Sequence, residues 1–225
     1  MNFTKNISKV KFSLDLDNMK VKYPKTKHLP FSKGLTRGDK IIESLEPFIG
    51  KEIIVSIKMD GENSTLGRDF IYARSLDSTD HPSNHWLKGL WGNINYEIPE
   101  NWRICGENLF AVHSIPYTDL SSYFMVFNIW NEKNECLSWD DTVDYCDLLG
   151  LTHVPVIWRG IFDEDTLKKI ANELDTVKNE GFVIRISDGF DFKDFQKYTA
   201  KWVREKHVKT SSHWKYEKII KNGLK

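Results

Sequence analysis

A lysine followed at once by an acid and a glycine stands at the end of a short apolar segment, in the sequence Lys58-Met59-Asp60-Gly61. Residues 52–57 are rich in β-branched side chains and follow Gly50, so we expect a mostly buried strand that ends where Lys58 emerges. Such a strand end holds the lysine in place and leaves its amine open to a ligand. The alternative is an exposed lysine before an ordinary Asp-Gly turn, and these four residues alone do not separate the two.

Other short segments follow this lysine in a particular order. They are Arg74-Ser75, Cys105-Gly106-Glu107-Asn108-Leu109-Phe110, Phe124-Met125-Val126-Phe127-Asn128-Ile129, Glu180-Gly181-Phe182-Val183-Ile184-Arg185 and Lys201-Trp202-Val203-Arg204. With the Lys58 segment, they resemble the six nucleotide-binding motifs of ATP-dependent RNA ligases, in the family typified by the phage nick-sealing RNA ligase. The superfamily of that enzyme also contains DNA ligases and mRNA capping enzymes. The resemblance extends over about residues 20 to 215, and the flanking segments 23–30 and 206–210 share it.

This resemblance implies an ATP-dependent RNA ligase that works through a covalent lysyl-AMP at Lys58. AMP would pass from the lysine to a 5′-phosphate, and a 3′-hydroxyl would then displace it. The implied cofactors are ATP and Mg²⁺ (or Mn²⁺), and the implied partner is RNA, nicked or single-stranded, with DNA left open. A capping-type or DNA ligase-type nucleotidyltransferase, or a non-catalytic RNA-end-binding protein that keeps the fold, are the alternatives.

The resemblance also implies a role for each matching side chain. Lys201 and Glu180 join Lys58 as catalytic residues, and Glu180 would organise the metal through water, with Asp60 as a second candidate ligand. Arg74 would contact the nucleotide and the phosphate end of the strand, Glu107 the ribose, and Phe127 the adenine by stacking. The nucleotide-binding set further includes Ile57, Asp60, Arg185 and Lys201. Without the other motifs, Phe127 is equally an ordinary core residue and Arg74 a surface arginine of a hairpin.

The sequence departs from the family pattern at three places. Asn128 stands where many relatives have Asp, so we expect Asn128→Asp to change the Mg²⁺ or Mn²⁺ dependence of sealing. Arg185 stands where the phage enzyme has Lys, which replaces a point charge by a planar fork. In the last motif only Lys201 matches with certainty, because Val203 and Arg204 follow it.

A lysine nucleophile needs a neutral amine, although a free lysine has a pKa of about 10.4 and is almost fully protonated at neutral pH. Burial and nearby positive charge both favour the neutral form. We therefore expect the pKa of Lys58 to be lowered by desolvation, by Lys201 and Arg185, and by the metal.

The distribution of apolar residues predicts an α+β fold of two mainly antiparallel sheets flanked by helices, which agrees with the nucleotidyltransferase domain that the resemblance implies. Strands are expected at residues 52–57, 64–66, 70–74, 102–106, 124–130, 154–158, 181–186 and 198–203, and helices at 138–150, 163–174, 39–45 and 214–220. No Gly-, Ser- or Pro-rich linker interrupts the sequence. We expect one nucleotidyltransferase domain, residues 1–225, without an OB-fold domain.

Charge is unevenly distributed along a chain whose formal net charge is zero. Residues 1–40 carry 10 Lys or Arg against 3 Asp, and residues 196–225 carry 9 against 2 Glu, so the middle is acidic. If the fold brings the two basic ends to one face, they form a surface for nucleic-acid phosphates, and Lys206, Lys209, Lys215 and Arg74 are its candidate residues. The alternative is two solvated termini. We expect removal of the residues after Thr210 to impair sealing and leave adenylylation of Lys58 largely intact.

Other function classes fit the sequence less well. There is no Walker-type or dinucleotide-binding glycine motif, and His81 and His85 lack the glutamate of a zinc protease motif. The three cysteines are widely spaced, which indicates reduced thiols. Neither a membrane span nor a signal peptide is recognisable, so we expect an intracellular (cytoplasmic) protein. We also expect a monomer. A phage or virus is one candidate source of the sequence.

Overall fold

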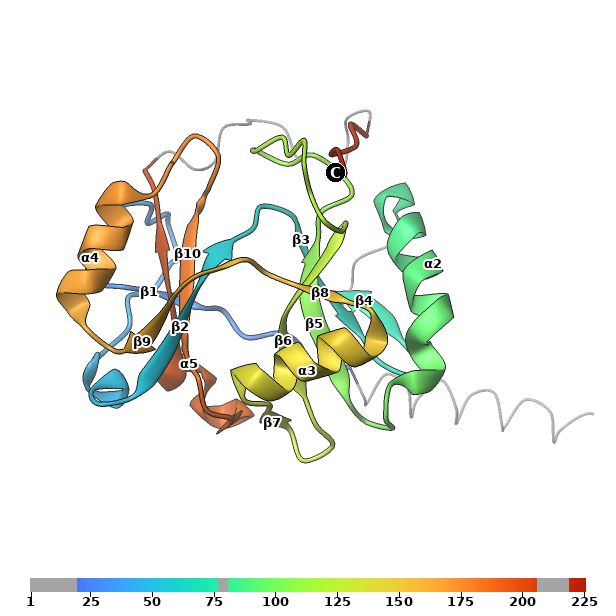
Figure 1. Ribbon diagram of the computed structural model, residues 1–225, viewed down its shortest axis with the longest axis horizontal. Helices are drawn as coiled ribbons and strands as arrows, with labels where there is room; N and C mark the ends of the chain where they lie inside the picture. The colour runs from blue at the N-terminus through green and yellow to red at the C-terminus, as the bar shows by residue number, and fades with distance from the viewer. Residues whose placement is uncertain (1–19, 77–80, 206–218) are drawn as a thin grey trace, which may run out of the picture.

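The computed structural model describes residues 20–76, 81–205 and 219–225. It confirms the predicted α+β architecture, since two mainly antiparallel sheets pack against each other and helices flank them (Figure 1). None of the helices in these three ranges is long and apolar enough to cross a membrane.

The first sheet has five strands. Their order is β1 (Lys27–His28), β12 (Thr199–Val203), β10 (Gly181–Ile186), β2 (Glu52–Lys58) and β9 (Val156–Ile161). Strand β2 is predicted correctly, and its five inner residues are buried because β10 and β9 pair with it on both edges. Lys58 is its last residue, opposite Gly181 in the register.

The second sheet has seven strands. Along its main path they are β11 (Phe190–Asp191), β7 (Glu135–Cys136), β6 (Phe124–Trp130), β5 (Arg103–Asn108), β3 (Glu62–Leu66) and β4 (Ile71–Ala73), and β8 (Thr152–His153) pairs with β6 in parallel. The predicted hairpin is confirmed in β3 and β4, and it ends immediately before Arg74.

In the described part of the chain, four α-helices and several 3₁₀ turns lie on the sheets. The helices are α2 (His85–Ile94), α3 (Trp139–Leu149), α4 (Glu164–Glu173) and α5 (Phe195–Tyr198), and the 3₁₀ turns are η1 (Glu46–Phe48), η2 (Pro82–Asn84), η3 (Asn95–Glu97) and η4 (Phe192–Asp194). The predicted ends of α3 are confirmed, because the amide of Asp141 donates to the Ser138 hydroxyl at 3.1 Å and Gly150 takes the left-handed conformation that ends a helix.

Two predicted elements differ in the structure, and a third lies mostly outside the described residues. Residues 39–45 form no helix, because the amides of His28 and Ile42 exchange bonds with Lys40 and His28 carbonyls and hold this segment beside β1. The strand predicted at 154–158 begins only at Val156, since Pro155 has no amide to donate. The helix predicted at 214–220 lies mostly outside the described residues, and residues 219–220 are not helical.

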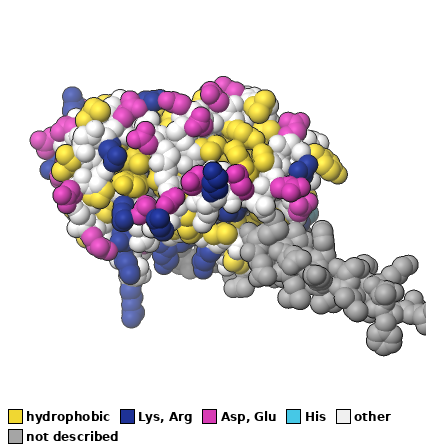
Figure 2. Space-filling model, turned by 90° about the horizontal axis from the view of Figure 1, so that it is seen from below, with side chains coloured by type: hydrophobic (Ala, Val, Ile, Leu, Met, Phe, Trp, Pro, Cys, Tyr) yellow, Lys and Arg dark blue, Asp and Glu magenta, His cyan; other side chains and the backbone are white. Residues whose placement is uncertain are grey.

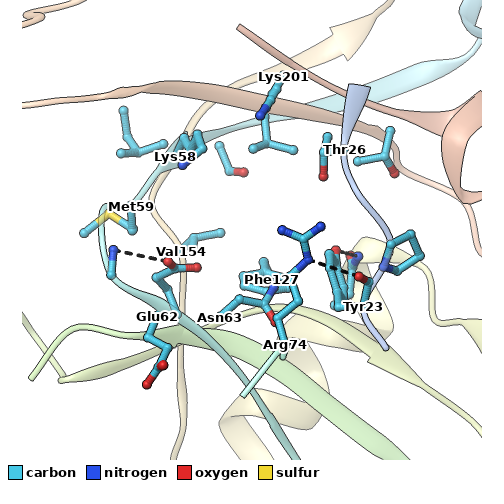
Figure 3. A pocket seen from close by; sticks show the side chains of 18 of the residues that line it. Tyr23, Thr26, Lys58, Met59, Glu62, Asn63, Arg74, Phe127, Val154 and Lys201 are labelled. Carbon is cyan, nitrogen blue, oxygen red and sulfur yellow. Dashed lines mark hydrogen bonds between the residues drawn. The ribbon is translucent and has the colours of Figure 1, made fainter. Parts of the chain in front are cut away.

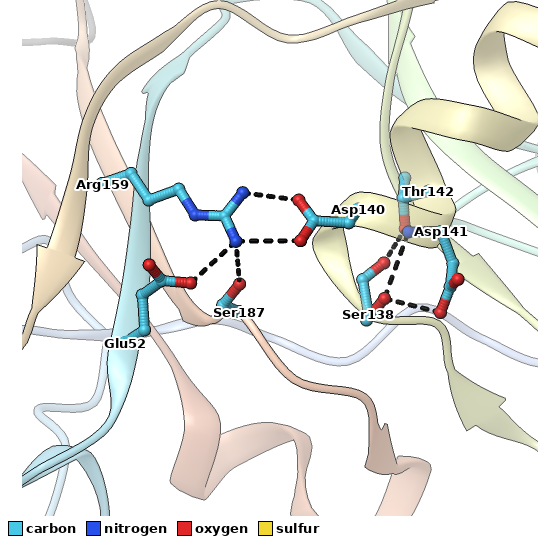
Figure 4. Close-up of polar contacts among 7 residues, drawn as sticks. All are labelled: Glu52, Ser138, Asp140, Asp141, Thr142, Arg159 and Ser187. Atoms are coloured by element: carbon cyan, nitrogen blue, oxygen red, sulfur yellow. Dashed lines mark hydrogen bonds and ion pairs between the residues drawn. The ribbon is translucent and has the colours of Figure 1, made fainter.

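Two arginines connect the sheets. The guanidinium of Arg185 on β10 donates to the Asn128 side chain on β6 at 2.7 Å and to the Leu137 carbonyl at 2.6 Å. Arg159 on β9 binds Glu52 at 2.7 Å and forms a bidentate pair with Asp140 at the start of α3 (Figure 4). These contacts set how far apart the side chains on the two sheets stand.

Candidate active site

The loop that follows β2 passes close to the backbone of the second sheet. At Gly61 a Cβ atom would clash with the carbonyl oxygen of Asn108, and at Gly181 it would clash with that of Trp202. Both glycines therefore permit a close approach of two backbones. As a result Lys58 and Glu180, which precede these glycines, project from neighbouring strand ends toward the same space.

This space adjoins a cavity of about 450 Å³ between the two sheets, a volume typical of small-ligand sites. Lys58 lines the cavity, whereas Glu180 and Asp60 are not among its lining residues. Figure 3 shows Lys58 and Lys201 on one side of it and Arg74, Phe127 and Tyr23 on the other. Its lining contains most of the side chains that the sequence singles out: Ile57, Lys58, Arg74, Glu107, Phe127, Asn128, Arg185 and Lys201. Segments from all parts of the described chain thus meet at one place.

Lys58 forms an ion pair with Glu180, and the distance from Nζ to Oε2 is 2.5 Å. The side chains are 27% and 10% exposed, so water screens the pair only partly. Burial by itself lowers the pKa of Lys58, but the negative charges of Glu180, Glu107 and Asp60 outweigh it and raise the pKa above the usual value. The expectation of a lowered lysine pKa is therefore wrong for the free protein.

The carboxyls around Lys58 repel each other. Burial raises the pKa of Glu107 to about 8, and the charges of Glu180 and Asp60 add to the increase, while Lys58 opposes it. Glu107 also accepts a hydrogen bond from the amide of Gly61 at 3.2 Å. Burial and the neighbouring carboxylates thus favour the protonated form of Glu107, which can donate a hydrogen bond to a hydroxyl of a bound ligand.

Positive charge in the cavity comes from Lys201, on the same side as Lys58, and from Arg74 on the opposite side. Burial and the charge of Lys58 lower the pKa of Lys201. Arg74 is held by a bond from its Nε to the Tyr23 carbonyl at 3.2 Å, which leaves the end of the guanidinium pointing into the cavity (Figure 3). An anionic group in the cavity would lie between these cations.

Phe127 and Tyr23 form an aromatic wall. Phe127 is partly buried, and its ring lies edge-on to that of Tyr23 with centroids 5.2 Å apart. A partly exposed ring of this kind offers its face to a planar base, and such stacking is worth about 1–3 kcal/mol in nucleic-acid binding proteins. Phe127 is thus both a core residue and a candidate stacking residue.

The floor of the cavity is a closed hydrogen-bond network. The Asn128 amide donates to the hydroxyl of Tyr23 at 2.7 Å and accepts from Arg185 at the same distance. All three guanidinium nitrogens of Arg185 donate to acceptors inside the protein, and its side chain is buried. Its predicted contact with the nucleotide gains no support from this arrangement, which instead makes Arg185 a support beneath the site.

Asp60 is fixed by the loop that follows β5. Its Oδ2 accepts bonds from the amides of Ser114 and Ile115 at 2.7 and 2.8 Å, and its own amide donates to the hydroxyl of Tyr117 at 3.0 Å. With one oxygen engaged in this way, Asp60 is a poor candidate for direct metal binding. The described residues contain no cluster of three or more metal-ligating side chains.

Several cavity residues were missed as functional residues by the sequence analysis. They are Thr26, Asn63 and His113, and Tyr117 joins them through its bond to Asp60. Only Thr26 had a signal, because the flanking segment 23–30 was noted as similar to ligases. Among the predicted nucleic-acid contacts, Lys206, Lys209 and Lys215 lie outside the described residues.

Comparison with known proteins identifies the family of the chain. The family model of RNA ligases matches residues 51–203, more than half of the chain, and the chain belongs to this RNA ligase family. The match does not distinguish the phage nick-sealing branch. No curated protein matches the chain by sequence.

Solved structures with the same fold include three ligases. An archaeal ATP-dependent RNA ligase has a TM-score of 0.55 and 16% identity, over 81% of this chain and 48% of that one. A Naegleria gruberi RNA ligase with PPi gives 0.54 and 17%, over 81% and 57%, and a putative ATP-dependent DNA ligase from Aquifex aeolicus gives 0.53 and 20%, over 81% and 49%. Identities this low establish the fold alone, and the chain spans about half the length of these structures.

Proposed function

We propose that this protein is an ATP-dependent RNA ligase that carries AMP on Lys58. One observation supports this most strongly: Lys58 stands at a strand end inside a nucleotide-sized cavity, with Lys201 on the same side, Arg74 opposite it and Phe127 in the wall. A lysine, two cations and an aromatic face are the groups that nucleotidyl transfer requires.

The reaction proceeds in three displacements at phosphorus. Neutral Lys58 attacks the α-phosphorus of ATP, so that a P–N bond forms, a P–O bond breaks and pyrophosphate leaves. A 5′-phosphate oxygen then attacks the adenylyl phosphorus and releases the lysine, and a 3′-hydroxyl finally attacks the activated 5′-phosphorus and releases AMP. Lys201 and Arg74 stabilise the charge that develops on the phosphoryl oxygens.

Glu180 is the residue best placed to hold a divalent cation. A Naegleria gruberi RNA ligase has been solved with ATP and Mn. Mg²⁺ commonly binds through one or two carboxylates, several waters and the phosphates of the nucleotide. The carboxylate of Glu180, which lies beside the Lys58 amine, fits that pattern. The cation would supply positive charge to the phosphates.

Adenylylation is the direct test of this proposal. Incubation with ATP should add one AMP to the peptide that contains Lys58, and Lys58→Ala should abolish the adduct. Glu180→Ala and Lys201→Ala should also abolish it while the thermal melting temperature stays near that of the wild type. An adduct retained in Lys58→Ala, preferential labelling by GTP, or no adduct in the wild type would each contradict the proposal, and the last would favour a non-catalytic binding protein.

The RNA strand has a place to bind beside this cavity. A second cavity of about 460 Å³ shares Tyr23, Pro24, Thr26 and Arg74 with the first. Its remaining lining includes four lysines from the basic N-terminal segment: Lys22, Lys25, Lys27 and Lys40. Figure 2 shows a surface on which acidic side chains spread over much of one face while Lys and Arg project mostly along its lower edge. We infer that a phosphodiester backbone follows this basic cavity toward Arg74.

Salt dependence tests this placement. Substitution of Lys22, Lys25 and Lys40 by Gln should leave adenylylation intact and weaken RNA binding, and it should reduce the slope of log affinity against log salt by about 2 to 3. Substitution of Lys133, Lys168 and Lys169, which are exposed elsewhere, makes the same change in charge and serves as the control. Equal slopes in the two triple variants would contradict the inferred path.

A further inference from the structure

The segment after the last motif returns to the catalytic domain. Residues 219–225 lie across the loop 109–123, which connects β5 to β6 (Figure 1). Backbone bonds join the two along their length: Val112 N–H donates to the Ile220 carbonyl, Gly223 N–H to the Tyr117 carbonyl, and Leu120 N–H to the Gly223 carbonyl, at 2.8 to 3.0 Å. We expected removal of the residues after Thr210 to leave adenylylation of Lys58 largely intact. The bonds from residues 219–225 to this loop do not favour that expectation.

Asn222 is the centre of this contact and is only 1% exposed. Its side-chain nitrogen donates to the Leu109 carbonyl at 2.8 Å, and its side-chain oxygen accepts from the amide of Tyr117 at 2.8 Å. Its own carbonyl accepts from the hydroxyl of Tyr123 at 2.8 Å. One side chain thus joins the beginning of the loop to its middle.

The neighbouring Gly223 lets the two backbones come this close. A Cβ atom at this position would lie 2.8 Å from the carbonyl oxygen of Thr118. Backbone atoms cannot move aside as a flexible side chain can, so a larger residue here should lift the segment from the loop.

The same loop holds Asp60 from its other side. The amides of Ser114 and Ile115 and the hydroxyl of Tyr117 are the groups that bind Asp60, and all three belong to residues 109–123. Asp60 is two residues after Lys58, and its charge acts on the lysine amine. The contacts therefore run from Asn222 through the loop to Asp60 and the nucleophile.

We propose that residues 219–225 form a clamp, defined here as the segment that fixes loop 109–123, and that Asn222 is a positioning residue for adenylylation of Lys58. This proposal rests on the proposed function. Phe127, Glu107 and Arg74 lie on the second sheet or directly after its strands, and among the described residues no hydrogen bond or ion pair joins any of them to the clamp. Loss of the clamp should therefore slow the chemical step and leave ATP binding nearly unchanged.

Single-turnover adenylylation of the full chain tests the clamp. Asn222→Ala should lower the rate of Lys58-AMP formation about 10- to 100-fold, the range expected for a misplaced reacting group. The dissociation constant for ATP should stay within about 2-fold, and the reaction amplitude, which counts correctly folded molecules, should stay near that of the wild type. Gly223→Ala is the second variant in case Asn222→Ala folds poorly. Ile220→Ala is the control, because that side chain is exposed and only its backbone bonds the loop.

A double-mutant cycle shows whether Asn222 acts through the loop. Tyr117→Phe removes the hydroxyl that binds the Asp60 amide, so its effect on the rate should be non-additive with that of Asn222→Ala. Additive effects, or a wild-type rate in both Asn222→Ala and Gly223→Ala, would overturn the proposal. A reduced amplitude at a normal rate would also overturn it, because it would show a role in folding alone.

A small amine-reactive acylating reagent, used without ATP, distinguishes failure of the clamp from failure of the ligase assignment. The measured quantity is the acylation rate of Lys58. If the loop releases Asp60, the strand end around Lys58 becomes less enclosed, and the reagent should acylate Lys58 faster in Asn222→Ala, relative to exposed Lys169. This result would support the clamp even if no AMP adduct formed in the wild type. An unchanged relative rate would overturn the clamp whatever the reaction of the protein proves to be.

Discussion

Through its ion pair with Lys58, Glu180 has two opposite effects on this nucleophile. Glu180 holds the Lys58 amine in its protonated form in the free protein, although we propose that it is required for adenylylation. Glu180→Gln keeps the size of the side chain and removes its charge. Burial lowers the pKa of Lys58, and the charge of Glu180 is the strongest influence that opposes it, so Glu180→Gln should lower this pKa and increase the fraction of neutral amine. A hydrogen bond to a charged group is worth about 1.5–3 kcal/mol, so the amine should react about 10-fold faster or more, although Glu107 and Asp60 remain.

Competitive acylation measures this change directly. The protein is treated at pH 8 with a small acylating reagent in the absence of ATP, and mass spectrometry gives the rate at Lys58 relative to Lys169, which is 74% exposed. We expect faster acylation of Lys58 in Glu180→Gln, together with loss of the AMP adduct when ATP is supplied. The two opposite results from one substitution are the signature of this dual role.

A matched variant controls for general effects of removing a carboxylate. Glu164→Gln removes the partner of Lys168, and both of these side chains are more than 40% exposed. Because water screens such a pair, acylation of Lys168 should change by less than about 2-fold. Acylation of Lys58 that is unchanged or slower in Glu180→Gln would refute the argument, because it would show that Glu180 does not keep the amine protonated.

Three further predictions follow from buried and paired charges. Glu107→Gln should raise the melting temperature at pH 9 and have little effect at pH 4: burial raises the pKa of Glu107 to about 8 in the fold, so its protonated form loses stability as the pH rises from the usual pKa of a glutamate to about 8, and the loss is complete at pH 9; a melting curve at each pH checks this. Asn128→Asp should leave the Mg²⁺ titration of adenylylation unchanged, contrary to the sequence-based expectation, because the new carboxylate would pair with Arg185 beneath the cavity. Arg159→Gln should lower the melting temperature slightly at pH 7 and not at pH 3. Hydrogen bonds from Arg159 lower the pKa values of Asp140 and Glu52, so the stabilisation exists above the usual pKa values of these carboxyls and is lost as both become protonated.

Elements with a complete local signal were predictable from the sequence. The strand before Lys58 has continuous β-branched residues and glycines at both sides, and the structure places it at Glu52–Lys58. Helix α3 has a serine cap, an acid three residues later and a terminal glycine, and each of these makes the predicted contact or conformation. In both cases local preference and tertiary packing favour the same structure.

Elements that depend on distant partners were not predictable in this way. Residues 39–45 have helical spacing of apolar residues, yet their backbone bonds go to His28. Helix α2 was missed because Gly89 and Gly92 lower its helix propensity, although Trp86, Leu87, Leu90, Trp91 and Ile94 recur at helical spacing. The predicted pKa shift of Lys58 was also wrong, since no local pattern reveals that Glu180 and Glu107, from distant segments, join Asp60 beside it.

The arrangement of the site explains why connections between the sheets matter for its chemistry. Lys58, Glu180 and Lys201, the groups that act on phosphate, belong to the first sheet, whereas Arg74, Glu107 and Phe127 belong to the second. A nucleotide in the cavity must reach both sets at once, so a small shift of one sheet would separate the reacting amine from a correctly bound base. The buried contact from Arg185 to Asn128 holds this spacing at the floor of the cavity, and the clamp holds it through the loop at the Lys58 end. The surface pair at Arg159 and Asp140 is more exposed, and its loss should therefore disturb the spacing least.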